Sequence, residues 1–150
     1  MTHIDFYVLS QTSVEARLEF ACKLAETIYR KGYQLYIHCE DEAAARALDD
    51  QLWTFRPESF VPHTLTENTL EESNKEGAKS PIIIGWHDTP PMGVEVLLNL
   101  HPDVPEWFSR FERVAEIINQ NQQVLNDKRA CWQLYKQRGY PVKAHQIKQQ

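Results

Sequence analysis

The pair His38 and Cys39 is the first combination in the chain whose residue types could support nucleophilic catalysis, because an imidazole can activate a thiol. It ends a predicted strand, where α/β proteins often place their ligands. Adjacent strand residues point to opposite faces, however, so this imidazole is not expected to reach this thiol. The acidic residues 40–42 would also oppose a thiolate. We therefore predict that Cys39 is a small buried apolar residue.

The sequence contains no familiar motif for nucleotide, metal or acyl chemistry. The first strand-to-helix turn, LSQTSVEA, has no glycine, although dinucleotide loops need glycines to approach a pyrophosphate. Neither GxxxxGK[ST] nor GxSxG occurs, the histidines show no HxxxH or HExxH spacing, and the cysteines form no CxxC pair. We expect no metal, no cofactor and no catalytic residue. A binding module is favoured, and a small α/β nucleotide-binding enzyme or sensor is the alternative.

The last predicted helix, residues 121–138, combines an apolar stripe with cations. At about 100° per residue the stripe contains Val124, Leu125, Cys131, Trp132 and Tyr135. Arg129 and Lys136 border it, and Lys128 falls inside it. A lysine in a buried stripe is unfavourable unless it snorkels or pairs. We therefore expect part of the stripe to reach solvent beside three cations, where an acidic peptide with an apolar anchor could bind. The alternative is that Trp132 and Tyr135 are ordinary core.

Charge is distributed unevenly along the 150 residues. The net charge is −5, but the segment from Asp127 onward carries +5 and the preceding residues carry −10. A basic end on an acidic body suits an anionic ligand or an acidic peptide better than duplex DNA, although a solvated basic helix would give the same pattern. Single-stranded bases could stack on the aromatic residues. The acidic body would repel a long polyanion.

Composition also indicates the compartment and the number of domains. No apolar run approaches the roughly 20 residues that a membrane helix needs. Three widely spaced cysteines do not suggest a disulfide framework. We expect one soluble domain over residues 1–150, cytoplasmic and without a membrane partner.

Aromatic residues gather in QLWTFRPESFVPH, residues 51–63, where Pro57 and Pro62 oppose regular structure. Sequence alone predicts that Trp53 and Phe55 belong to the core. It leaves Phe60, Val61 and Pro62 either as a lid over a core edge or as anchors for a partner.

Alternating strands and helices must position these residues. Strands are predicted at 3–10, 33–39, 81–86, 94–101 and 113–118, with a loop over 64–80. A capping box, TSVE, predicts that Thr12 caps the first helix, which Gly32 ends. A second helix is predicted at 40–53. This order favours a single-domain, Rossmann-like α/β sheet, largely parallel, with helices on both faces and no nucleotide-binding loop.

The segments FYVLS, PIIIGW and VLLNL, together with HCEDEAAARALDDQLWTFRPESFVPH and FSRFERVAEII followed by WxxYKxxGY, carry a family resemblance. In this collinear order the chain resembles the chi subunit of bacterial DNA polymerase III holoenzyme over nearly its whole length. The resemblance implies a non-catalytic member of the clamp-loader assembly with no nucleotide site. It also implies two partners: the psi subunit, and the acidic, Phe-ended C-terminal tail of single-stranded DNA-binding protein. Contact with single-stranded DNA would be mainly indirect.

The resemblance also implies site residues. The tail site would contain Arg129, Trp132 and Trp53, with Lys128 or Lys136 replacing a family cation at the position of Leu125. The psi-facing surface would contain Phe60, Val61 and Pro62, together with Ile118 at the end of the strand 113–118.

Overall fold

The computed structural model describes residues 2–54, 63–65, 81–87 and 93–147. Within these residues, seven strands form one sheet in the order β3-β4-β2-β5-β6-β1-β7, and all neighbouring strands run parallel. The strands are β1 (His3–Val8), β2 (Leu35–His38), β3 (His63–Leu65), β4 (Ile82–Gly85), β5 (Val96–Asn99), β6 (Arg113–Ile118) and β7 (Val142–Gln146). The predicted parallel α/β sheet is confirmed.

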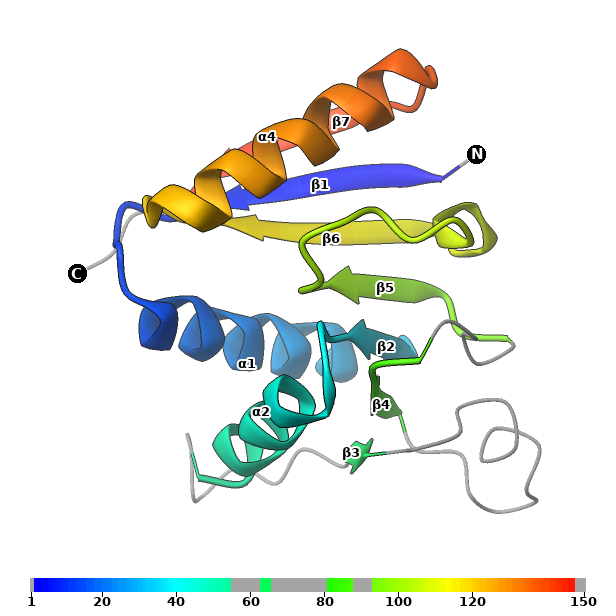
Figure 1. The fold of residues 1–150 in the computed structure, drawn as a ribbon. Helices are drawn as coiled ribbons and strands as arrows, with labels where there is room; N and C mark the ends of the chain where they lie inside the picture. Colours follow the sequence, from blue (N-terminus) through cyan, green and yellow to red (C-terminus); the bar gives the residue numbers. More distant parts are fainter. Residues whose placement is uncertain (1, 55–62, 66–80, 88–92, 148–150) are drawn as a thin grey trace.

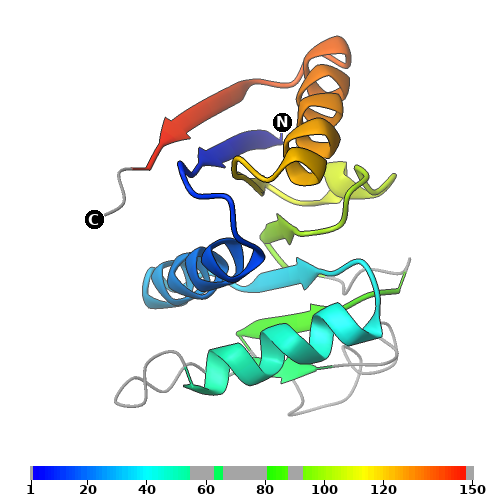
Figure 2. The same ribbon diagram turned by 60° about the vertical axis from the view of Figure 1, so that its left-hand side comes forward.

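Helices cover both faces of this sheet, as the sequence predicted. Helices α1 (Val14–Arg30) and α2 (Glu42–Thr54) pack on one face, and α4 (Gln122–Gln137) packs on the other (Figures 1 and 2). A 3-10 turn, η1 (Phe108–Arg110), lies on the same face as α4. Because parallel strands bury both faces, the sheet separates two apolar clusters.

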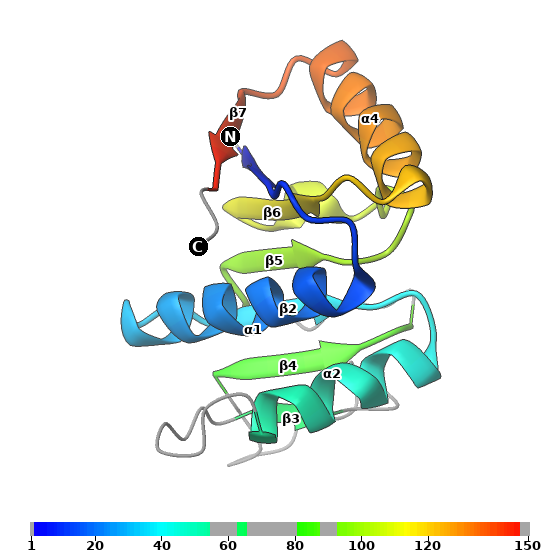
Figure 3. The same ribbon diagram turned by 90° about the vertical axis from the view of Figure 1, so that its left-hand side faces the viewer.

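Alternation along the strands assigns residues to these clusters. On β2, Leu35 and Ile37 face α1 and α2, whereas Tyr36 belongs to the cluster beneath α4. On β1, Ile4 and Phe6 also lie in the cluster beneath α4. The two helical layers therefore contact different sides of the same strands, and α2 and α4 also lie at opposite ends of the sheet (Figure 3).

Some local predictions are wrong. The N-cap of α1 is Ser13, whose hydroxyl accepts from the Ala16 N–H at 3.1 Å, and not Thr12. Thr64 and Leu65 belong to β3 rather than to a loop, and β7 follows the last helix as an additional edge strand. The sequence pattern does not predict β7, because the polar residues of VKAHQ give only a weak strand signal.

The end of α1 and the start of α2 both have well-defined local contacts. Gly32 follows α1 with φ of +88°, in the left-handed region that favours glycine. The helix 40–53 corresponds to α2, where the Asp41 carboxylate accepts from the Ala44 N–H at 2.8 Å. This contact satisfies one of the N–H groups that the first turn of a helix leaves unpaired.

Candidate protein-binding surface on helix α4

Helix α4 has well-defined ends. The Asn121 side chain accepts from the backbone N–H groups of Gln123 and Val124, which caps the first turn. Gly139, with φ of +83°, ends the helix in the left-handed conformation. These two signals fix the length of α4 and therefore the positions of the side chains that it presents.

The predicted apolar stripe holds α4 on the sheet. Cys131 and Tyr135 are buried, and Trp132 is half-buried. The Trp132 indole packs edge-on against Phe6 of β1, with ring centroids 5.0 Å apart. Tyr135 packs edge-on against Phe108 at 5.1 Å. The prediction of a stripe is confirmed, and the indole forms its outer border.

Lys128 does not reach solvent, contrary to the prediction from the apolar stripe. Its side chain is 1% exposed, and its ammonium lies 2.6 Å from Glu116 Oε1 on β6, a residue that is itself 0% exposed. The same ammonium donates to the carbonyl of His101 at 2.6 Å. Lys128 therefore pairs inside the protein instead of reaching solvent, and it does not supply a surface cation.

Glu116 is the centre of a buried polar network. Its Oε2 accepts from the Tyr135 hydroxyl at 2.6 Å and from the Asn99 amide at 2.9 Å, while Oε1 accepts from Lys128. Lys128 and Tyr135 are two turns apart on α4, so one carboxylate from β6 fixes both the rotation and the height of the helix. Sequence reasoning missed Glu116, although a lysine inside an apolar stripe does signal a buried counter-ion.

The network also affects titration. Burial, followed by the nearby Glu116 charge and its hydrogen bond, raises the pKa of Tyr135 well above its ordinary value. Burial, with a smaller contribution from Glu116, raises the pKa of Cys131 to about 12.

Cys39 is 1% exposed, and burial raises its pKa to about 12. The prediction that Cys39 is a buried apolar residue is confirmed.

The outer side of α4 presents two cations around the indole. Arg129 and Lys136 are exposed, and they stand three residues before and four residues after Trp132, the spacings at which helical side chains are neighbours. The Lys136 ammonium lies 5.7 Å from the centroid of the Trp132 ring, within the range of a cation–π contact. The three side chains can therefore act on one ligand.

Ile118 belongs to the same side of the molecule. It is the last residue of β6, is 9% exposed, and lies in the apolar cluster against which Trp132 packs. Its position therefore associates it with α4. Phe60, Val61 and Pro62, with which it was grouped in the psi-facing surface, lie outside the described residues.

Trp53 does not join Arg129 and Trp132. It lies in the last turn of α2. Helix α2 packs on the opposite face of the sheet from α4, at the other end of the strand order (Figures 1 and 3). The prediction that it is core is also wrong, because Trp53 is 50% exposed. Helical periodicity could not show this, since it does not tell which helix covers which face.

The described residues contain neither a metal-binding cluster nor a membrane-spanning helix. Within residues 2–54, 63–65, 81–87 and 93–147, no group of three or more His, Cys, Asp or Glu side chains could hold a metal ion. No helix in that part of the chain is both long enough and apolar enough to cross a membrane.

Known structures share this fold at low sequence identity. The crystal structure of T4 UvsW matches with a TM-score of 0.68 and 10% identity, over 97% of this chain and 41% of that chain. Domain 2 of the DEAD-box helicase Mss116p, bound to an RNA duplex, matches with a TM-score of 0.61 and 12% identity, over 97% of this chain and 65% of that chain. At such identities the likeness concerns the fold alone.

Sequence comparison is more specific. Residues 1–143 match the family model described as DNA polymerase III chi subunit, HolC. The DNA polymerase III subunit chi of Pseudomonas aeruginosa is 37% identical, with 98% of both chains covered. That of Haemophilus influenzae is 26% identical, with 95% of this chain and 96% of the relative covered. The chain therefore belongs to the family of DNA polymerase III chi subunits, which have a non-catalytic accessory role in DNA replication.

Proposed function

We propose that the outer surface of α4 binds the acidic, Phe-ended C-terminal tail of single-stranded DNA-binding protein. The observation that supports this proposal is the placement of exposed Arg129 and Lys136 on either side of the half-buried Trp132. Through this contact the chain links the replicase to the coated lagging-strand template.

The chemistry of such a tail suits these three side chains. A guanidinium can donate two parallel hydrogen bonds to a carboxylate, so Arg129 can fix either the terminal carboxylate or an acidic side chain. The Phe ring of the tail can pack against the indole of Trp132, since aromatic residues dominate binding energy at small interfaces. Ile118 lies in the same buried cluster as Trp132 and, at 9% exposed, can add only a small apolar area to this surface.

A preorganised helix strengthens the proposal. The buried contacts of Glu116 with Lys128 and Tyr135 hold α4 on the sheet, so Arg129 and Lys136 project from a rigid scaffold. Less conformational entropy is lost when a ligand meets a fixed surface than when it must order a mobile one. Lys128 thus contributes indirectly to the proposed site, in place of the direct role expected from the sequence.

We assign psi binding to a second surface, which includes Phe60, Val61 and Pro62. Trp53 is half-exposed and lies in the last turn of α2, the helix that precedes this segment in the sequence, so we group it with these residues and not with the tail site. We assign Ile118 to the surface on α4 instead of the psi-facing surface. Among the described residues, Trp53 lies on α2 and the proposed tail site on α4, so the two partners would contact different helices.

A pull-down on purified single-stranded DNA-binding protein tests the function. The full-length protein should capture this chain, and a truncated form without its terminal residues should not. Equal capture by the two forms would contradict tail recognition. A signal that disappears after nuclease treatment would mean that DNA, rather than the tail, bridges the proteins.

A further inference from the structure

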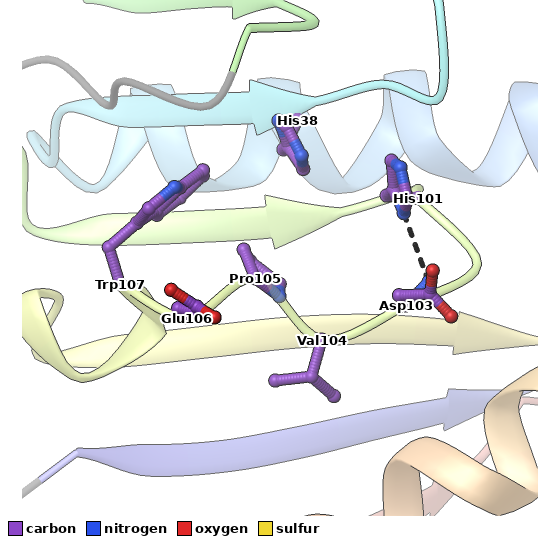
Figure 4. Close-up of a pocket in the computed structure, with 7 residues that line it drawn as sticks. All are labelled: His38, His101, Asp103, Val104, Pro105, Glu106 and Trp107. Atoms are coloured by element: carbon purple, nitrogen blue, oxygen red, sulfur yellow. Dashed lines mark hydrogen bonds between the residues drawn. The ribbon is translucent and has the colours of Figure 1, made fainter.

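A cavity lies between His38, the last residue of β2, and the segment that leaves β5 and returns along the sheet towards β6. Its volume is about 380 Å³, and Figure 4 shows the side chains around it. His38 is the last residue of β2, His101 follows the end of β5, and the remaining lining residues come from the segment that leaves β5: Asp103, Val104, Pro105, Glu106 and Trp107.

One end of this cavity, at His38 and His101, lies at the carboxyl ends of β2 and β5, where ligands commonly bind in such folds. Strands β2 and β5 are parallel neighbours, with His38 in register with Asn99. After β2 the chain turns to α2 on one face, whereas after β5 it turns to η1 on the other face. Such a divergence of two adjacent strands is a topological switch point, and it opens a crevice beyond the carboxyl ends of the strands.

Aromatic rings form the inner walls. The imidazoles of His38 and His101 are stacked, with centroids 5.2 Å apart and planes 15° apart. The Trp107 indole meets His38 edge-on, with centroids 4.9 Å apart. His38 is 3% exposed, so this side of the cavity is largely desolvated. Flat walls of this kind favour a planar ligand.

The wall at His101 is held rigidly. The Asp103 N–H donates to His101 Nδ1 at 3.0 Å, which fixes the orientation of the ring. The carbonyl of His101 accepts from the buried ammonium of Lys128 at 2.6 Å. Both the ring and the backbone of this residue are therefore set before any ligand arrives.

The charge of the cavity selects the sign of the ligand. Asp103 and Glu106 are exposed and line its outer part, and the lining residues that the structure describes include no lysine or arginine. A phosphate or a carboxylate would be repelled by these two groups, whereas an organic cation would be attracted. The cavity thus has the opposite preference to the proposed tail site on α4.

We propose that this cavity receives the guanidinium group of an arginine side chain from a partner protein. A guanidinium is planar and weakly hydrated, so it stacks on aromatic rings while its N–H groups reach carboxylates. An ammonium offers neither the flat face nor the fork of donors, so lysine fits less well. This site is independent of the tail-binding and psi-binding proposals, and it provides the chain with a third point of contact.

Titration of the ¹⁵N-labelled protein with N-acetyl-L-arginine methylamide, followed by NMR, tests the site. The Trp107 indole N–H should shift saturably. N-acetyl-L-citrulline methylamide, a neutral isostere, should bind at least about tenfold more weakly, because it lacks the charge that strengthens the hydrogen bonds. No saturable shift, or equal affinity for the two probes, would overturn the proposal. This comparison needs only the wild-type chain.

Matched variants locate the binding. Asp103→Asn combined with Glu106→Gln keeps the shape and removes both charges, and it should weaken arginine binding by about tenfold. Glu112→Gln removes an exposed carboxylate outside the lining residues and should leave binding unchanged. Equal effects of the two changes would reduce the observation to general electrostatics and overturn the site. A Trp107 signal that depends on protein concentration without a probe would identify a second copy as the occupant and would contradict the proposed partner.

Discussion

Replacement of Lys128 by methionine would separate a structural role from a ligand-binding one. Lys128 and Glu116 are 1% and 0% exposed, so the change leaves a fully buried carboxylate without its cation. Removing one partner of a buried pair destabilises proteins by about 3–5 kcal/mol. For a chain of this length each kcal/mol corresponds to about 2–4 °C, so the melting temperature should fall by roughly 6–20 °C.

A second change would identify the cause of that loss. Adding Glu116→Gln to Lys128→Met removes the unpaired charge while keeping an amide oxygen for Tyr135 and Asn99. The double variant should therefore be more stable than Lys128→Met alone, by about 1–3 kcal/mol. Arg129→Ala is the matched control: it removes an exposed cation at the neighbouring position and should change stability by less than about 0.5 kcal/mol.

Urea denaturation followed by Trp fluorescence measures all three variants. A loss below about 1 kcal/mol for Lys128→Met would refute the reasoning, because it would be a value typical of exposed ion pairs. Such a small loss would also indicate that the Lys128 side chain is exposed to solvent, as the sequence alone predicts.

Other predictions concern pH, nucleotides and the psi partner. Burial raises the pKa of Cys22, Cys39 and Cys131 from 9.0 to about 12. The stabilisation from these neutral thiols is therefore complete below pH 9. As the pH rises towards 12, the free energy of unfolding should fall by up to about 1.4 kcal/mol per pH unit for each thiol. Cys39→Ala should make that fall shallower in denaturation curves, and an unchanged slope would contradict it. ATP, GTP and NAD should give no thermal shift, whereas a true ligand at 100 times its dissociation constant adds about 2.7 kcal/mol. Phe60→Ala should abolish capture of psi while tail binding and the melting temperature persist. Loss of all three would mean that Phe60 is core.

Periodic patterns predicted the elements well, because burial of a helix face or a strand leaves a direct mark on residue types. The strand 113–118 coincides with β6, and the stripe on the last helix contains the buried Cys131 and Tyr135. Edge strand β7 left a weaker mark, since a strand with one neighbour and exposed positions tolerates Lys143 and His145.

Relationships between distant elements were harder to predict. The partner of Lys128 comes from β6, and nothing in the local sequence of either element specifies that Glu116 faces α4. Trp53 was assigned to the tail site from resemblance, yet the sheet lies between α2 and α4. Sequence spacing shows which side of one element is apolar, but it does not show which elements share a face of the sheet.

Arg129 and Trp132 form the proposed contact for an acidic ligand, and calorimetric titration with an acidic, Phe-ended peptide tests this contact directly. Arg129→Ala should weaken binding by about 1.5–3 kcal/mol, the range for hydrogen bonds to charged groups. Arg138→Ala removes an exposed cation from the C-terminal end of α4 and serves as the charge-matched control, with affinity near that of the wild type. Equal affinity of the wild type and Arg129→Ala, or equal losses for the two arginine variants, would contradict the central claim.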